Sequence, residues 1–124
     1  MSDMLSRVAG APITWGADAS AGWGYMMDPA RVMSEMREAG LSATELGPDG
    51  FLPSDRQELK DFVAGYDMSM VGGFVPAILY QDKDMDADVQ YFERASDQLA
   101  EAGASNVVLG PRSHYDGYDT EIDM

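Results

Sequence analysis

The sequence contains no cysteine and a single histidine among its 124 residues. Without cysteine, neither a disulfide framework nor a thiolate zinc site is available. No apolar run approaches the roughly 18 residues that a membrane-spanning helix needs. Residues 1–7 lack a basic region followed by an apolar segment, so a secretory signal is not expected. These absences predict a cytoplasmic protein that does not associate with a membrane.

Basic residues are also scarce, because 8 Lys+Arg stand against 22 Asp+Glu and give a formal net charge of −14 at pH 7. A surface of that sign repels phosphate backbones, which argues against nucleic acid as a partner. At 124 residues the chain is long enough for one hydrophobic core. We therefore expect one domain, residues 1–124, that does not bind nucleic acid.

Residues 41–53 combine a short apolar strand, an acidic side chain and a tight turn. Residues 41–46 suit a strand buried in a parallel sheet, and residues 47–50 (GPDG) end it because they favour a turn. Ser54 and apolar side chains at helical spacing then predict a helix over residues 54–66. Glu45 thus lies at the C-terminal end of a strand, where βα folds bind ligands. The alternative is that Glu45 only fills the strand end and hydrogen-bonds a backbone amide.

The rest of the sequence repeats this alternation of strand and helix. Asp28 and Pro29 predict the start of a helix that ends at Gly40. Gly72 and Gly73 fall inside an apolar strand, which suggests that something must approach the backbone closely there. Further strands are expected at residues 11–15, at 70–75 (ended by Pro76) and at 106–109, and a further helix at 86–102 with Val89, Phe92, Ala95, Leu99 and Ala102 on one face. The predicted fold class is α/β, with four parallel strands and three helices.

Spacing alone reveals no complete metal site and no nucleophilic triad. Residues 82–93 place acids at most positions of an EF-hand loop, but Ala87 stands where the turn needs glycine and no helix precedes the loop. His114 follows the last predicted strand, so it is either a hydrogen-bonded structural residue or a partner of Glu45 on the same face. Asp116 and Asp119 add oxygen donors without a defined geometry.

Five segments of the sequence resemble the N-terminal half of the xylose-isomerase-like TIM-barrel superfamily, in its inosose-dehydratase-like branch. They are residues 11–16 (APITWG), 22–25 (GWGY), 43–53 (ATELGPDGFLP), 71–76 (VGGFVP) and 115–119 (YDGYD). The resemblance covers almost the whole chain. It implies that residues 1–124 form roughly half of a (β/α)8 barrel, truncated after the fourth strand and its loop.

The resemblance implies a sugar (phosphate) isomerase or epimerase that moves a proton on a keto-sugar or polyol, assisted by Mn²⁺, Co²⁺ or Mg²⁺. By position at strand ends, it implies Glu45 as the catalytic residue and Trp15, Glu45, Phe74 and His114 as substrate-binding residues. The family's metal ligands come mainly from the second half of the barrel, so no metal ligand is assigned in this chain. The parent family is enzymatic, whereas this chain is expected to lack the metal-binding half.

Other interpretations start from the same residues. An inosose dehydratase-like lyase of inositol catabolism fits the same five segments. A half-barrel has two unpaired strand edges and an open apolar interior, so a second alternative is a non-catalytic module that forms a homodimer through the open barrel face. The DNA-repair endonuclease branch of the superfamily needs several histidines and a positive groove, which one histidine and a net charge of −14 do not supply.

Overall fold

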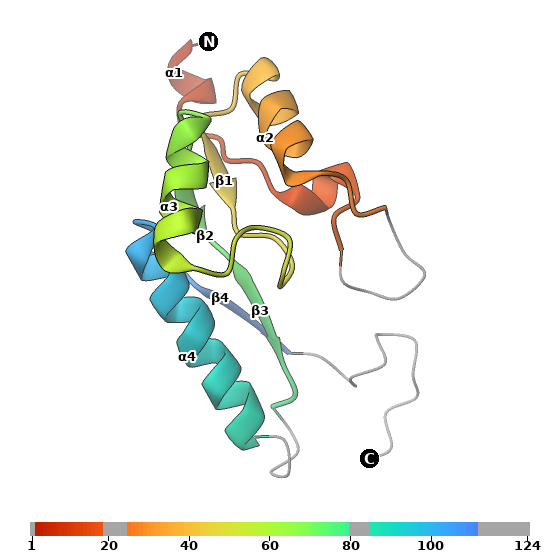
Figure 1. The fold of residues 1–124 in the computed structure, drawn as a ribbon, viewed down its shortest axis with the longest axis vertical. Helices are drawn as coiled ribbons and strands as arrows, with labels where there is room; N and C mark the ends of the chain where they lie inside the picture. The colour runs from red at the N-terminus through yellow and green to blue at the C-terminus, as the bar shows by residue number, and fades with distance from the viewer. Residues whose placement is uncertain (1, 19–24, 80–84, 112–124) are drawn as a thin grey trace.

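A computed structural model describes residues 2–18, 25–79 and 85–111. Helices and short strands both occur along this part of the chain (Figure 1). In chain order the elements are α1 (Ser2–Leu5), the 3-10 helix η1 (Pro12–Trp15), α2 (Pro29–Glu38), β1 (Ala43–Glu45), α3 (Arg56–Gly65), β2 (Ser69–Gly72), β3 (Phe74–Ala77), α4 (Met85–Glu101) and β4 (Val108–Pro111). None of the helices described is long and apolar enough to cross a bilayer.

The strands that the structure describes form two short parallel sheets, β1 with β2 and β3 with β4. Gly10 adds an isolated parallel bridge to Thr44 on the other side of β1. β3 follows β2 with only Gly73 between them, so these two strands succeed one another along the chain while β2 pairs with β1 and β3 pairs with β4. The structure is therefore α/β with short parallel sheets, and half of an eight-stranded barrel remains a prediction.

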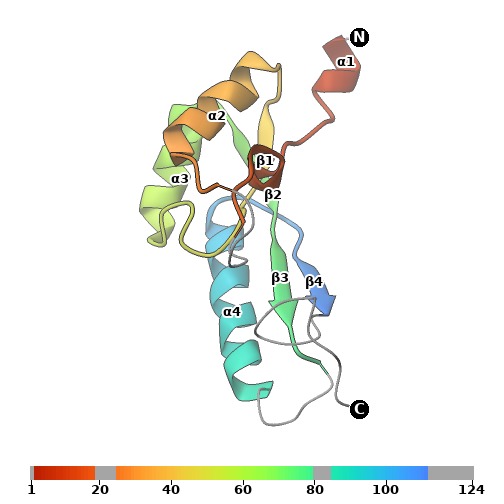
Figure 2. The same cartoon turned by 90° about the vertical axis from the view of Figure 1, so that its right-hand side faces the viewer.

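The helices α2, α3 and α4 lie on one side of the strands (Figure 2). Helix α3 contacts β2, and α4 contacts β3. Apolar side chains from these elements form the core: Val32, Met33, Met36, Leu59, Val63, Met70 and Leu99 are all at most 4% exposed. Phe74 and Val108, which are partners across β3 and β4, are by contrast 46% and 50% exposed. The core thus fills the space between the strands and the helices.

Helix α2 confirms the expected start at Asp28 and Pro29. The Asp28 side chain accepts a hydrogen bond from the backbone N–H of Ala30 at 2.8 Å, and Pro29 opens the helix without needing a partner for an N–H. Gly40, with φ +91°, follows the C-cap Ala39 and adopts the left-handed conformation that ends many helices.

Helices α3 and α4 differ from the prediction at single residues. The N-cap of α3 is Asp55 rather than Ser54, because the Asp55 carboxylate accepts hydrogen bonds from the N–H groups of Gln57 and Glu58. The apolar spacing predicts Val89 on the buried face of α4, but Val89 is 46% exposed. That face instead includes Asp88, whose Oδ2 accepts a hydrogen bond from the Ile78 N–H at 2.9 Å and so joins α4 to the end of β3. The buried position is therefore taken by Asp88, which accepts a hydrogen bond from a backbone N–H, and the neighbouring Val89 is left exposed.

The predicted strand at residues 11–15 is wrong, since Pro12–Trp15 is a 3-10 helix. The pairing with β1 is made one residue earlier, where Gly10 donates to the Ala43 carbonyl and accepts from the Glu45 N–H. Pro12 is fully buried and has no N–H to continue a ladder, and its fixed φ suits the first turn of a helix.

The predicted strand at residues 70–75 is divided into β2 and β3. The Gly72 carbonyl accepts from Leu46, and the Gly73 carbonyl accepts from Val108. A side chain on Gly72 would place its Cβ 2.9 Å from the Asn106 carbonyl oxygen, which confirms a close approach, although by protein backbone. Pro76 does not end the strand, because β3 continues to Ala77 and Pro76 pairs with Gly110.

Candidate functional site

Glu45 ends β1 with its side chain on the face turned away from the helices. The preceding residue, Thr44, is fully buried, and the following residue, Leu46, packs against the core. Because successive strand residues point to opposite faces, the Glu45 side chain lies on the other face. Its backbone N–H donates to the Gly10 carbonyl at 2.8 Å. Within residues 2–18, 25–79 and 85–111, the half-buried carboxylate has no hydrogen bond and no ion pair. The alternative, in which this carboxylate bonds a backbone amide, therefore finds no support in the described residues.

Phe74 begins β3, which pairs with β4 and follows β2, the partner of β1. Its ring covers Gly110 of β4 so closely that a Cβ on Gly110 would overlap the ring atoms. The ring is 46% exposed, while the following residue, Val75, is buried against the helical layer. Phe74 and Glu45 thus both occupy strand positions that alternate with buried residues, and no hydrogen bond or ion pair of the described chain links either one to Trp15.

Trp15 is attached to α2 rather than to the strand ends. Its indole Nε1 donates to Glu35 Oε2 at 2.8 Å, and Arg31 Nε donates to Glu35 Oε1 at 2.9 Å. The hydrogen bond from Arg31 is the main reason that the Glu35 pKa lies below its ordinary value, and the bond from Trp15 acts in the same direction against desolvation. Glu35 was missed from the sequence. The spacing of Arg31 and Glu35 predicts their ion pair, but nothing local indicates the third partner.

The described residues do not assemble a metal site. No group of three or more His, Asp or Glu side chains that could hold a cation occurs in residues 2–18, 25–79 and 85–111. His114, Asp116 and Asp119 lie outside the described residues, so the expected neighbourhood of Glu45 and His114 stays a prediction. The Glu45 carboxylate by itself does not fit a divalent cation, which needs several ligands.

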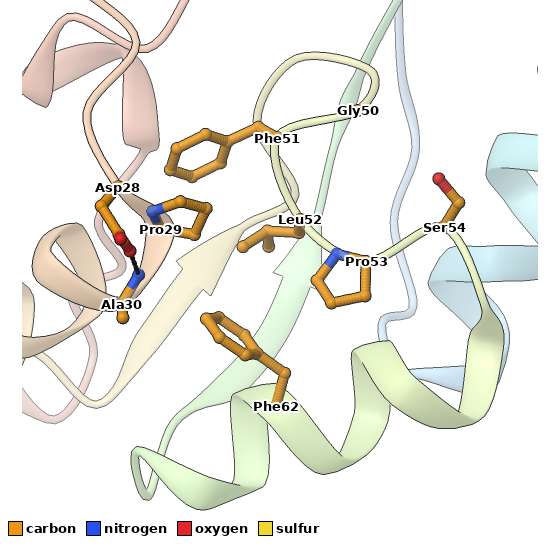
Figure 3. A pocket seen from close by; sticks show the side chains of 9 residues that line it. All are labelled: Asp28, Pro29, Ala30, Gly50, Phe51, Leu52, Pro53, Ser54 and Phe62. Atoms are coloured by element: carbon orange, nitrogen blue, oxygen red, sulfur yellow. Dashed lines mark hydrogen bonds between the residues drawn. The ribbon is translucent and has the colours of Figure 1, made fainter.

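A groove of about 420 Å³ lies between the start of α2, the β1–α3 loop and α3 (Figure 3). Figure 3 shows the rings of Phe51 and Phe62 facing it from opposite sides, with Leu52 between them. Its one charged side chain, Asp28, is engaged with the Ala30 N–H. Most of the lining residues are apolar, and the Asp28 carboxylate already serves as the N-cap of α2.

A second groove, of about 310 Å³, lies between the same loop and α4. Its lining residues include three charged ones, Asp49, Arg56 and Arg94. Glu45 and Trp15 line neither groove, whereas Phe74 lines the second. The predicted site residues and the grooves are therefore largely separate features.

Comparison with known proteins shows a similarity that spans most of the chain. The chain is 32% identical over 110 residues to the rhizopine catabolism protein MocC of Rhizobium meliloti. The alignment covers 89% of this chain and 33% of that protein, so the chain spans about a third of the length of its relative. No family model matches the sequence. Over most of its length, then, the chain resembles part of a rhizopine catabolism protein.

Proposed function

We propose that this chain supplies the first strands of a xylose-isomerase-like barrel that acts on a keto-sugar or polyol in a catabolic pathway. The similarity to a rhizopine catabolism protein over 89% of the chain supports a catabolic role. The parallel order of the strands, with helices on one side, supports the barrel. Because the chain spans about a third of that relative, the activity is proposed for the completed barrel.

The observation that carries the proposal is the unpaired carboxylate of Glu45 at the end of a parallel strand. A half-buried acid with no partner among the described residues is free to accept a proton from a bound molecule. In our proposal Glu45 removes a proton from a hydroxyl-bearing carbon beside a carbonyl, giving an enediolate and a protonated Glu45. Return of the proton from Glu45 to the former carbonyl carbon, with transfer of the hydroxyl proton between the two oxygens, is isomerisation. Delivery of a proton from water to the opposite face of the original carbon, with Glu45 keeping the proton that it removed, is epimerisation. Loss of a hydroxyl as water from the adjacent carbon would instead give the dehydratase reaction.

Donors for Mn²⁺, Co²⁺ or Mg²⁺ are not gathered among the described residues, so no step of this proposal passes through a metal ion. The part assigned to this chain is proton transfer by Glu45, with the exposed ring of Phe74 as a substrate contact. Trp15, which is bound to Glu35, would set the position of the segment that follows η1 rather than take part in the chemistry.

Proton exchange measured by NMR in D₂O tests this function. The chain, and a chimera in which it replaces the aligned region of the Rhizobium relative, would be incubated with keto-inositol and ketoses, with and without Mn²⁺. We expect loss of the signal of the proton beside the carbonyl, slowed by Glu45→Gln by about 10²–10⁴-fold, the usual contribution of a general base. Glu38→Gln is the matched control, because Glu38 is an exposed carboxylate on α2.

Exchange at wild-type rate in the Glu45→Gln chimera would remove Glu45 from the mechanism. If neither the chain nor the chimera shows exchange or dehydration, the proposed proton-transfer function is wrong. Exchange in the chimera alone would locate the missing groups in the remainder of the relative's sequence.

A second candidate is self-association without catalysis, which the exposed apolar residues of β3 and β4 favour. Phe74, Val108 and Leu109 are each about half exposed, an uncommon state for neighbouring large apolar side chains. The net charge of −14 opposes the approach of two copies, so we expect any dimer to strengthen as salt rises. Light scattering at micromolar concentration decides: a monomer at both low and high salt contradicts this candidate.

A further inference from the structure

The groove between the β1–α3 loop and α4 is not lined by Glu45, although Phe74 is among its lining residues. It has a volume of about 310 Å³. Leu46 and Val75 are apolar lining residues, and both pack toward the helical layer. The polar lining comes from the loop and from α4, and includes Asp49, Arg56 and Arg94. It is therefore a groove in the helical layer with a charged rim.

Two contacts hold the walls of this groove together. Gln98 of α4 donates from Nε2 to the Pro53 carbonyl of the loop at 2.9 Å. Arg56, at the start of α3, lies 3.2 Å from Asp97 of α4 through Nη2 and Oδ2. Because both contacts connect α4 to the segment before or at the start of α3, the rim is organised before any ligand arrives, which reduces the ordering cost of binding.

The two arginines of the groove, Arg94 and Arg56, have different interaction partners. The Arg94 guanidinium lies 5.8 Å from the centre of the Tyr91 ring, and within the described ranges it has no carboxylate partner. Arg56 is held by Asp97, while its side chain stays 57% exposed. The sequence has only 8 Lys+Arg, and two of them line this one groove. Two guanidinium groups that line one groove are suited to an oxyanion, which they can bind through paired N–H donors.

We propose that this groove binds a small hydroxylated anion, with its phosphate or carboxylate group on Arg94 and Arg56. The carboxylate of Asp49 would repel a bare anion, but it can accept hydrogen bonds from hydroxyl groups on the same molecule. The ligand class is therefore a sugar phosphate or a sugar acid rather than a simple ion. This proposal is independent of Glu45 and of the proposed proton transfer.

Titration of the chain, followed by NMR and calorimetry, tests the site. Glucose 6-phosphate and gluconate are the anionic probes, and glucose is the uncharged comparison. We expect saturable binding of at least one anion and none of glucose. Arg94→Gln should weaken binding about tenfold, the loss of one charge-assisted hydrogen-bonding group. Asp97→Asn should strengthen it severalfold, because it releases Arg56.

The matched control is Arg7→Gln, since Arg7 is an exposed cation in the turn after α1. Helices α1 and α4 lie toward opposite ends of the molecule (Figure 1). Circular dichroism of each variant checks the fold. Binding that Arg94→Gln reduces and Arg7→Gln leaves unchanged supports the site, and the preferred probe assigns phosphate or carboxylate. Absence of saturable binding, or equal weakening by both substitutions, overturns it. Because the readout is binding, failure here leaves the exchange experiment on Glu45 unaffected.

Discussion

Gly47→Ala gives the sharpest test of the loop that borders both grooves. Gly47 has φ +78°, and a Cβ there would lie 2.8 Å from Pro12 Cγ and 3.3 Å from Phe51 Cδ1. Pro12 is fully buried and its ring cannot rotate away. The left-handed conformation costs an alanine about 1–2 kcal/mol, and overpacking a buried site costs about 1–3 kcal/mol. We expect the free energy of unfolding to fall by about 2–5 kcal/mol.

Two other glycines separate these contributions. Gly50 has φ +81°, but a Cβ at this position would have no neighbouring atom within 4 Å, so Gly50→Ala should cost only the conformational part, about 1–2 kcal/mol. Gly65 has neither a positive φ nor a close neighbour, so Gly65→Ala should raise the free energy of unfolding by about 0.4–1 kcal/mol through the unfolded chain.

Urea denaturation with linear extrapolation measures all three variants. The expected order of stability is Gly65→Ala, wild type, Gly50→Ala and then Gly47→Ala. If Gly47→Ala and Gly50→Ala differ by less than about 0.5 kcal/mol, below the smallest overpacking cost expected, the contact with Pro12 does not constrain the loop as described.

Three further results are expected. Leu59→Ala empties a fully buried position of α3 and should lower the free energy of unfolding by about 2–5 kcal/mol in the same urea assay. Asp88→Ala leaves the Ile78 N–H without its acceptor and should cost about 1–3 kcal/mol, whereas Asp88→Asn, which keeps an acceptor oxygen, should cost less. The folded-state pKa of Glu35 is lowered, so its stabilising effect is present above the ordinary value of 4.5 and is lost as pH falls through the folded pKa. Acid titration should therefore change Trp15 fluorescence below about pH 4.5 in wild type and not in Glu35→Gln; identical curves would contradict the indole–carboxylate bond.

The helices were predictable because their signals are local. Asp28 and Pro29 fix the start of α2 with atoms that lie within two residues of one another, and Leu59 and Val63 fix the buried face of α3 by their spacing. The error at the start of α3 was one residue, between two neighbouring side chains that both cap helices. Such a choice depends on the path of the preceding loop, which the sequence does not specify.

The strands were less predictable because their bounds depend on partners. Residues 11–15 have the composition of a strand, but β1 offers its hydrogen bonds to Gly10, and the chain then turns into η1. Pro76 is typical of a strand end, yet it lies in β3. Proline is tolerated at a strand position whose N–H would not point toward the partner strand, because no hydrogen bond of the ladder is then lost.

The polar contacts around the candidate site were the hardest to predict. The position of Glu45 at a strand end followed from the turn sequence immediately after it. The bond between Trp15 and Glu35 joins residues 20 apart, and the groove of Arg56 and Arg94 is formed by two different helices. Neither pairing leaves a periodic or local signal, so only the tertiary structure reveals it.

The transfer of pairing at Gly72 and Gly73 connects the fold with the proposed chemistry. The Gly72 carbonyl accepts a hydrogen bond from Leu46, just after β1, and the Gly73 carbonyl accepts one from Val108 of β4. The pairing with β4 therefore begins where the pairing with β1 ends. A closed parallel barrel also displaces each strand relative to the next, so this single transfer is compatible with the barrel that we propose. A doubly wound sheet would instead have helices on both faces and a strand that crosses to the other edge, whereas α2, α3 and α4 share one side (Figure 2). In a doubly wound sheet the face that carries Glu45 would be covered by helices; in the barrel that we propose, it is the interior, where a carboxylate can meet a substrate.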